Sequence, residues 1–396
     1  MKKITCIILI SIPFILKADY WIQKADFGGT ARFGVANFSI GNKGYIGLGS
    51  DAYPSYHFLN ELWEYDPSAD SWTQKASFPG AARYTPIAFA IGTKGYVGVG
   101  WNQVNSFNDL WEYDQTSNSW TQKGNFPGPL RQGGIAIVLN SKAYAGFGVN
   151  GSTLLNDFYS YNDTNDTWTP LANFSGPVRV PGFGFAINNR VYVGCGIAGG
   201  STFFSDTWEY NPSLNTWSQK ADFPGTGRYA GVYFTVNNKG YTGLGKNAST
   251  QFNDFYEYDP VTDFWIGKAS CTANIIEFGF TIGSKGYAGT GLSASLGISK
   301  QFWEYTPDST TAIAELNADN FISTFPNPTA AQVTLNFKKV INGSMQLFNS
   351  FGELLGQTQI SSSMFSTDMS NKPKGIYFIS VTDASGNKVV KKIVKM

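Results

Sequence analysis

The sequence predicts an all-β protein made of six repeated units followed by a small C-terminal β-domain. A strand of the form x-Tyr-x-Gly-x-Gly occurs six times, and successive tyrosines lie 51, 48, 48, 49 and 46 residues apart. Each unit contains runs of strand length separated by Gly, Asn and Pro, and none shows the apolar spacing of a helix. The six tyrosines are Tyr45, Tyr96, Tyr144, Tyr192, Tyr241 and Tyr287.

Composition agrees with this class and excludes several functions. Among 396 residues, 16% are aromatic and only 14% are charged, as in a folded, β-rich protein. The 29 Lys and Arg residues nearly balance the 28 Asp and Glu residues. The whole chain therefore does not attract nucleic acid or an anionic membrane. We expect a monomer.

The first 18 residues have the pattern of a secretory signal peptide. Two lysines precede an apolar run from Ile4 to Leu16, and Ala18 follows it. This run is too short to span a bilayer comfortably, and no later segment has the roughly 20 apolar residues of a membrane helix. After the leader two cysteines remain, Cys195 and Cys271. In an exported protein they could pair, but their different strand positions favour two buried free thiols.

Each repeat contains four strand-like runs, which in the second unit lie at 87–92, 94–100, 109–114 and 119–124. Four short strands and a period near 50 resemble kelch repeats, in which each unit is one blade of a β-propeller. The resemblance covers residues 19–308 and implies six blades. The repeats carry Gly-x-Gly where the usual pattern has Gly-Gly, and we expect these glycines to let neighbouring blades approach closely.

The N-terminal segment is predicted to close the ring. The sixth unit has three strands, and no Trp-x-Gln-Lys strand follows Pro307. The segment WIQKADF, Trp21 to Phe27, matches this missing strand and precedes the first unit. Pairing it with the last blade removes two exposed sheet edges, which would otherwise promote aggregation.

Two aromatic positions recur in every unit. In a single unit, the aromatic residues at these positions resemble a sugar-binding platform. Six copies favour packing between blades, because each such ring buries a large area in a core. The first series is Trp21, Trp72, Trp120, Trp168, Trp217 and Trp265. The second is Trp63, Trp111, Tyr159, Trp208, Tyr256 and Trp303.

Residues 309–320 are polar and are predicted to be a linker, and residues 321–396 form a small β-sandwich. This last domain carries PNPT at Pro326, a Phe-Asn-x-x-Gly motif at Phe348, GIYF at Gly375 and a basic end. The combination resembles the C-terminal sorting domain of the type IX secretion system. The resemblance implies that the secretion machinery is a partner, and that the protein crosses the periplasm to the outer-membrane surface or the medium. The alternative is an accessory β-sandwich.

Most catalytic constellations are excluded. His57 is the only histidine, so neither a site with two histidine ligands nor a histidine-based triad can form. The copper site of galactose oxidase, which is also a kelch propeller, needs histidines that this chain lacks. No phosphate-binding or dinucleotide motif opens a helix. We therefore predict no metal and no cofactor.

A ring of charged residues remains at the predicted mouth of the central channel. Thirteen residues before the register tyrosines stand Arg32, Arg83, Arg131, Arg179 and Arg228, with Asn274 in the sixth unit. Two residues before the third-strand aromatics stand Glu61, Asp109, Asp157, Asp206 and Asp254, with Gln301 in the sixth. The arginines either bind an acidic ligand or pair with these acids. The sixth unit loses both groups together, which favours pairing.

Residues on this face that do not repeat are the other binding candidates, because the packing symmetry does not explain them. Tyr53, Tyr56 and His57 lie in the longest loop of this face, and Trp101 begins another. Their aromatic rings could stack on sugars or on peptide side chains. Alternatively, they cover neighbouring loops.

Two functions follow from these observations. The first is a secreted or cell-surface binding protein that recognises a glycan or a protein through the face that carries the arginines. The alternative is a sugar-acid mutarotase or epimerase, since some periplasmic kelch propellers act on sialic acid, and Glu277 would then be the acid/base group. As an ordinary residue, Glu277 would be a solvated loop acid.

Overall fold

The computed structural model describes residues 19–273, 277–293, 297–308, 322–349, 354–384 and 388–396. The predicted leader and linker lie outside these ranges. The described chain falls into two compact units, with the boundary after Asp308. No helix in the described ranges is long and apolar enough to cross a membrane.

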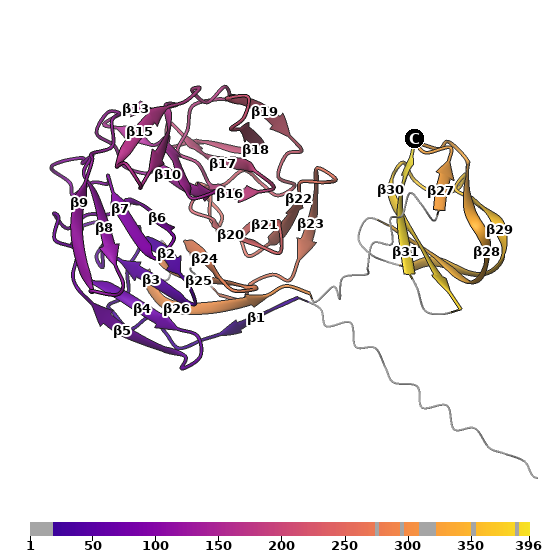
Figure 1. The fold of residues 1–396 in the computed structure, drawn as a ribbon, viewed down its shortest axis with the longest axis horizontal. Helices are drawn as coiled ribbons and strands as arrows, with labels where there is room; N and C mark the ends of the chain where they lie inside the picture. The colour runs from indigo at the N-terminus through magenta and orange to yellow at the C-terminus, as the bar shows by residue number, and fades with distance from the viewer. Residues whose placement is uncertain (1–18, 274–276, 294–296, 309–321, 350–353, 385–387) are drawn as a thin grey trace, which may run out of the picture. The chain divides into compact units, whose positions relative to one another are not determined.

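The first unit is a propeller of four-stranded antiparallel sheets arranged in a ring (Figure 1). The first blade consists of β2 (Ala36–Ile40), β3 (Lys43–Gly47), β4 (Leu62–Asp66) and β5 (Ser71–Lys75). The second consists of β6 (Ile87–Ile91), β7 (Lys94–Gly98), β8 (Leu110–Asp114) and β9 (Ser119–Lys123). The third consists of β10 (Ile135–Leu139), β11 (Lys142–Gly146), β14 (Phe158–Asn162) and β15 (Thr167–Pro170). A small hairpin, β12 (Val149–Asn150) and β13 (Thr153–Leu154), extends from the third blade.

The remaining blades repeat this order. The fourth consists of β16 (Phe183–Ile187), β17 (Arg190–Ala198), β18 (Thr202–Asn211) and β19 (Thr216–Lys220). The fifth consists of β20 (Val232–Val236), β21 (Lys239–Gly243), β22 (Phe255–Asp259) and β23 (Phe264–Lys268). The sixth consists of β24 (Phe278–Ile282), β25 (Lys285–Ser293), β26 (Gly297–Thr306) and β1 (Tyr20–Gln23).

The innermost strand of each blade separates a packed face from a channel face. In β6, Ile87, Phe89 and Ile91 are buried, whereas Ala88 and Ala90 between them are partly exposed. This alternation follows from the two-residue period of a strand. The first, third and fifth residues of each innermost strand fill the core between blades, and the second and fourth residues (the even positions) line the central channel.

The N-terminal strand closes the ring as predicted. β1 pairs antiparallel with β26, and Trp21 lies opposite Tyr305. Figure 1 shows this first strand beside the orange β26, far from it in the sequence. The last blade therefore has the same four strands as the others.

Neighbouring blades are joined by a repeated set of hydrogen bonds, in which side chains of one blade bind the backbone amide and carbonyl of a single residue of the preceding blade. At the seam between the sixth and first blades, Trp72 donates to the carbonyl of Ala25 at 3.2 Å. The amide of the same Ala25 donates to Asp70 at 3.0 Å, and Tyr65 donates to that carboxylate at 2.7 Å. The corresponding Trp donors at the other seams are Trp21, Trp120, Trp168, Trp217 and Trp265. The recurring Trp residues of this series therefore join blades, as predicted.

The glycines serve two purposes, and those of Gly-x-Gly act both within their own blade and toward the next one. At Gly98, the first glycine of such a motif, a Cβ would lie 2.5 Å from the backbone oxygen of Asp109 in the same blade. The residue that follows, Val99, has a φ of 51°. Gly-x-Gly therefore forms a tight bend, and the amide of its second glycine, Gly100, donates to the carbonyl of Arg131 in the next blade at 2.9 Å. Close blade approach also depends on another glycine, Gly95, where a Cβ would lie 2.2 Å from the ring of Phe38 in the preceding blade.

Both described cysteines, Cys195 and Cys271, are buried and free, as the sequence favoured. Burial raises the pKa of the Cys271 thiol to about 12. The pKa of the Cys195 thiol is also raised, again mainly by burial. Neither thiol is in the reactive, ionised form at neutral pH.

The second unit is one curled five-stranded sheet. Its strands are β27 (Ile322–Phe325), β28 (Gln332–Asn349), β29 (Leu354–Asp368), β30 (Gly375–Asp383) and β31 (Lys388–Lys395). The long β28 pairs with β27, β29 and β30, and its register against β29 shifts between Asn336 and Ile341. Side chains from both halves of β28, including Leu335 and Leu347, join one buried core. The sheet thus folds over itself and encloses that core as a small β-sandwich does.

Candidate functional site

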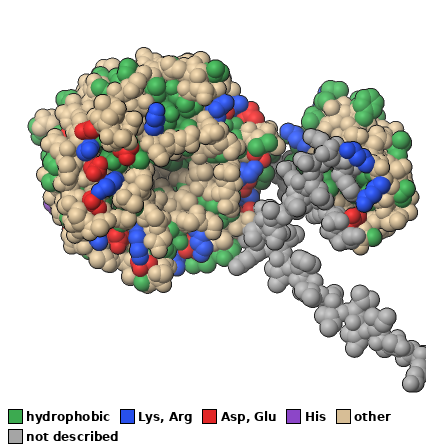
Figure 2. Space-filling view, in the orientation of Figure 1, with side chains coloured by type: hydrophobic (Ala, Val, Ile, Leu, Met, Phe, Trp, Pro, Cys, Tyr) green, Lys and Arg blue, Asp and Glu red, His purple; other side chains and the backbone are tan. Residues whose placement is uncertain are grey.

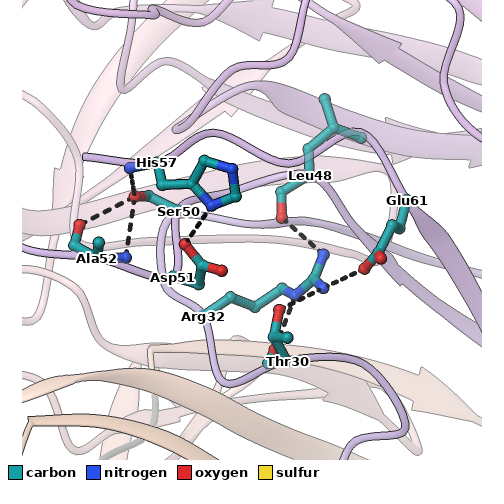
Figure 3. A network of polar contacts seen from close by, with 8 residues as sticks. All are labelled: Thr30, Arg32, Leu48, Ser50, Asp51, Ala52, His57 and Glu61. Carbon is teal, nitrogen blue, oxygen red and sulfur yellow. Dashed lines mark hydrogen bonds and ion pairs between the residues drawn. The ribbon is translucent and has the colours of Figure 1, made fainter.

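Each ring arginine is buried and forms an ion pair within its own blade. Arg32 Nη2 lies 2.5 Å from Glu61, while its Nη1 and Nε donate to the carbonyls of Leu48 and Thr30 at 3.2 and 3.0 Å (Figure 3). The other pairs are Arg83–Asp109, Arg131–Asp157, Arg179–Asp206 and Arg228–Asp254.

Every ring arginine lies over one phenylalanine ring, and Arg83, Arg179 and Arg228 lie over a second. Arg83 lies between two rings, with its Cζ 5.0 Å from the centroid of Phe78 and 3.9 Å from that of Phe107. It is 1% exposed, and it also donates to the carbonyl of Val99 in the bend described above. These contacts give the arginines a role in holding each blade together. That they bind an acidic ligand stays a prediction. Asn274, their sixth counterpart, lies outside the described residues.

The residue that follows each ring arginine lines the central cavity. Because successive side chains of an extended segment point to opposite sides, burial of the arginine turns its neighbour toward the channel. Each of these residues forms an isolated β-bridge to the residue after Gly-x-Gly, as Tyr229 does with Lys246. The cavity-lining neighbours are Phe33, Tyr84, Gln132, Val180 and Tyr229.

The cavity has a volume of about 990 Å³ and is lined by the innermost strands of all six blades. Figure 2 shows a hollow at the centre of the ring in the face that it presents. Its wall extends from residues beside the ring arginines, such as Tyr84, to the far ends of the innermost strands, such as Ser39 and Thr281.

Tyrosines crowd one side of the cavity entrance. The centroids of Tyr56 and Tyr84 lie 5.4 Å apart, and those of Tyr53 and Tyr56 lie 5.7 Å apart. The ring of Tyr53 is the most open to solvent, with 59% exposure. Trp101 contacts Tyr56 edge-on at 5.8 Å but does not line the cavity, so it supports this cluster from behind.

The predicted site residue His57 lies apart from the cavity lining. Its ring nitrogen Nδ1 is 2.8 Å from Asp51, and its side chain is 69% exposed (Figure 3). The backbone amide of His57 donates to Ser50 at 3.1 Å. The structure therefore brings Tyr53 and Tyr56 to the cavity, and it places His57 on the outer side of the same loop.

A lysine and a glutamate complete the entrance. Lys246 Nζ lies 2.7 Å from Glu277 Oε1 and donates to the carbonyl of Leu292 at 3.0 Å. The Glu277 side chain is 16% exposed, so it is not the solvated loop acid of the simplest interpretation. Burial alone would lower the pKa of Lys246, but Glu277 outweighs it and the pKa is raised. Burial also raises the pKa of Tyr84, and the nearby Tyr56 and Glu277 raise it further.

Lys246, Tyr84 and Tyr229 were missed by the sequence analysis. The signal for them was available, because each occupies a repeat position at which the blades differ, beside a motif at which they agree. Tyr84 and Tyr229 directly follow ring arginines, and Lys246 directly follows a Gly-x-Gly motif. The sequence motifs draw attention to the residues that recur in every blade, whereas these three residues lie directly after such motifs, at positions that vary between blades. In the described part of the chain, no group of three His, Cys, Asp or Glu residues could hold a metal ion.

Comparisons with known proteins agree with this architecture. A family described as "KLHDC2/KLHL20/DRC7 Kelch-repeats domain" matches residues 28–186, and one described as "Secretion system C-terminal sorting domain" matches residues 323–396. A solved structure described as "Structure of YjhT" is 16% identical with a TM-score of 0.63, and the match covers 72% of this chain and 98% of that chain. At this identity the likeness shows the fold alone. No curated protein matches the chain significantly.

The sorting domain implies recognition by the type IX secretion machinery and secretion across the outer membrane. The blades, their closure and the matched repeats identify the first unit. The chain is thus a kelch-repeat β-propeller protein with a C-terminal sorting domain of the type IX secretion system.

Proposed function

We propose that the propeller is an extracellular binding module that takes a glycan into its central cavity from the face that carries the ring arginines. The observation that carries this proposal is the tyrosine cluster at the cavity entrance. Tyr53, Tyr56, Tyr84 and Tyr229 all line the cavity, at positions where the sequences of the blades differ. The module would act attached to the outer-membrane surface or released from it.

The residue types at the entrance suit a sugar. An aromatic ring offers a flat apolar face to the C–H groups of a pyranose, and a tyrosine adds a hydroxyl that can donate or accept. A cavity of about 990 Å³ lies within the range of small-molecule pockets, at roughly 300 to 1,000 Å³. Protein partners more often contact a broad surface of about 800 Å² on each side. The concave shape therefore favours a glycan over a folded protein.

Lys246 can add a directed polar contact. An ammonium group has three N–H donors, and Glu277 and the carbonyl of Leu292 accept two of them. The third is able to donate to a hydroxyl or carboxyl oxygen of a ligand. Because Glu277 neutralises the lysine, the described cavity lining carries no net charge.

The test is a glycan array probed with the mature full-length chain, followed by calorimetry on the glycans that bind. Tyr53→Ala and Tyr56→Ala should each weaken binding by about fivefold, because each removes a stacking face worth roughly 1 kcal/mol. The control is Leu214→Ala, since Leu214 is 69% exposed in the turn between β18 and β19, away from the cavity. Equal affinity for all three variants, or binding to no glycan, would refute the proposal.

A second candidate function is a sugar-acid mutarotase or epimerase, and the position of Glu277 favours it. This carboxylate lines the cavity and lies 2.7 Å from the ammonium group of Lys246, and tyrosines line the same cavity, an arrangement suited to moving protons. The assay is anomer exchange of sialic acid followed by NMR, with Glu277→Gln as the variant. An exchange rate equal to the uncatalysed rate would eliminate this candidate without affecting the first.

A further inference from the structure

The channel below the entrance has a chemical character of its own. Its wall consists of two rings of side chains at the even positions of the innermost strands. The upper ring is Asn37, Ala88, Ala136, Gly184, Tyr233 and Gly279. The lower ring is Ser39, Ala90, Val138, Ala186, Thr235 and Thr281.

Neither ring contains a charged residue. The charged side chains of the described cavity lining are Lys246 and Glu277, which pair with each other at the entrance. The channel instead offers small apolar side chains and neutral hydrogen-bonding groups. A charge moved into such a place would leave water without gaining an opposite partner, which is costly.

Tyr233 is the single bulky residue of the upper ring. The five other residues at its level are smaller, and two of them are glycines. Tyr233 packs against the hydrophobic cluster of the third and fourth blades and against that of the fourth and fifth blades. Burial raises the pKa of Tyr233 to about 12, so its hydroxyl stays protonated at neutral pH and is able to donate. No described residue forms a hydrogen bond with this hydroxyl or with the side-chain amide of Asn37. Both groups remain available to a guest in the channel.

The closed ring limits how a chain can enter. Six blades surround the channel, and β1 completes the last of them, so the wall has no lateral opening between strands. The middle of a polymer cannot pass sideways into such a channel. Only the end of a chain, or a free small molecule, can reach Tyr233.

We infer, on the basis of the glycan binding proposed above, that the channel recognises the uncharged end of a glycan chain, with Tyr233 and Asn37 binding its terminal unit. The preceding units of the glycan then lie against Tyr53 and Tyr56 at the entrance. Tyr233 is a specificity-determining residue in this arrangement. Its hydroxyl supplies a donor, and its ring restricts the room beside the small residues of the upper ring.

The experiment uses the mature full-length chain and the neutral linear oligosaccharides of the glycan array. Each one that binds is compared with the same oligosaccharide carrying a bulky group at one end, then at the other, and with a version that ends in a uronic acid. We expect a loss of at least tenfold when one particular end is blocked or charged. Blocking the opposite end should leave the affinity within twofold.

Two variants test the channel itself. Tyr233→Phe keeps the ring and its packing but removes the hydroxyl, and it should weaken binding about fivefold to tenfold. Ala136→Phe narrows the upper ring and should abolish entry, whereas Ala81→Phe, at an exposed position outside the cavity lining, should bind normally. Melting temperatures of all three variants verify that they are folded. If Ala136→Phe does not fold, Tyr233→Phe and the end-blocked oligosaccharides still test whether the channel binds the end of the glycan.

The outcomes separate this inference from the proposed function. If neutral glycans bind and respond to Tyr53→Ala, but neither the blocked ends nor Tyr233→Phe alter the affinity, the channel inference is overturned and the binding function stands. Binding restricted to glycans with acidic ends would overturn it in the same way. If no glycan binds at all, both fail together.

Discussion

Tyr305 donates a 2.8 Å hydrogen bond to Oδ2 of Asp19, 286 residues away in the sequence. The same carboxylate accepts the amide of Ala269 in the fifth blade at 2.6 Å. At the other seams the acceptor lies five residues after its tyrosine, as Asp70 does after Tyr65. Asp19 therefore replaces a turn residue of the last blade, and one side chain joins the two ends of the ring.

Asp19→Ala should destabilise the propeller. The substitution leaves the hydroxyl of Tyr305 and the amide of Ala269 without their acceptor, and each lost partner costs roughly 1 to 3 kcal/mol when its donor is buried. Urea unfolding, followed by tryptophan fluorescence, measures the loss. Asp19→Asn is the matched control, because Asn118 and Asn215 serve as acceptors at equivalent positions. An alanine variant as stable as the asparagine variant would contradict this account of closure.

Arg131 and Asp157 should behave as a coupled structural pair. Two hydrogen bonds of 2.6 and 2.5 Å join them, and Arg131 is fully buried. Either single substitution to Ala strands a partner and should cost on the order of 2 to 4 kcal/mol, while the double variant should cost less than the sum. A double-mutant cycle by urea unfolding gives the coupling energy. Additive losses would show that the pair does not act as a unit.

Acid should destabilise the propeller partly through Asp206. Burial alone would raise the pKa of Asp206, but hydrogen bonds from Arg179 and Trp208 outweigh it, and the pKa lies below its usual value. A carboxylate with a lowered folded-state pKa stabilises the protein above its unfolded-state pKa of about 4, and this contribution is lost as the pH falls through the folded-state pKa. The measured free energy of unfolding should therefore decrease as the pH is lowered from about 6 to about 2.

The variant Asp206→Asn isolates this effect. It should be less stable than the parent at neutral pH, because Arg179 loses its counter-charge, but its stability should vary less below about pH 4. The exposed substitution Asp222→Asn should leave the profile of the parent unchanged. A profile for Asp206→Asn as steep as that of the parent would show that other acids dominate acid unfolding.

The C-terminal domain should be needed for export and dispensable for the stability of the propeller. Its core is built from its own residues, including Val333 and Ile393, and the compact units divide after Asp308. A chain that ends at Ala312 should melt at nearly the same temperature in its propeller transition and should stay in the periplasm of a host with a type IX system. Cell fractionation and immunoblotting measure its location. Arrival of the shortened chain at the surface or in the medium would disprove the sorting role.

Much of the fold and part of the site could be predicted because they depend on local repetition. The spacing of Tyr45 and its five counterparts defines the blades, and the match of Trp21 to Trp72 predicts closure. Joint loss of Arg and acid in the sixth unit predicts that Arg131 pairs with an acid, although the spacing did not decide which one. The structure selects Asp157 of the same blade.

The sequence by itself determined the architecture, because the strand period and the seam contacts recur along the chain and are therefore visible in one dimension. Only the tertiary structure decided the chemistry of the cavity. Lys246 and Glu277 come from different blades, and Tyr233 lines the same cavity as Asn37 and Gly184 only because the innermost strands converge on one axis. Repetition explains what every blade shares, whereas the cavity depends on the positions at which the blades differ, and a closed ring brings those positions together.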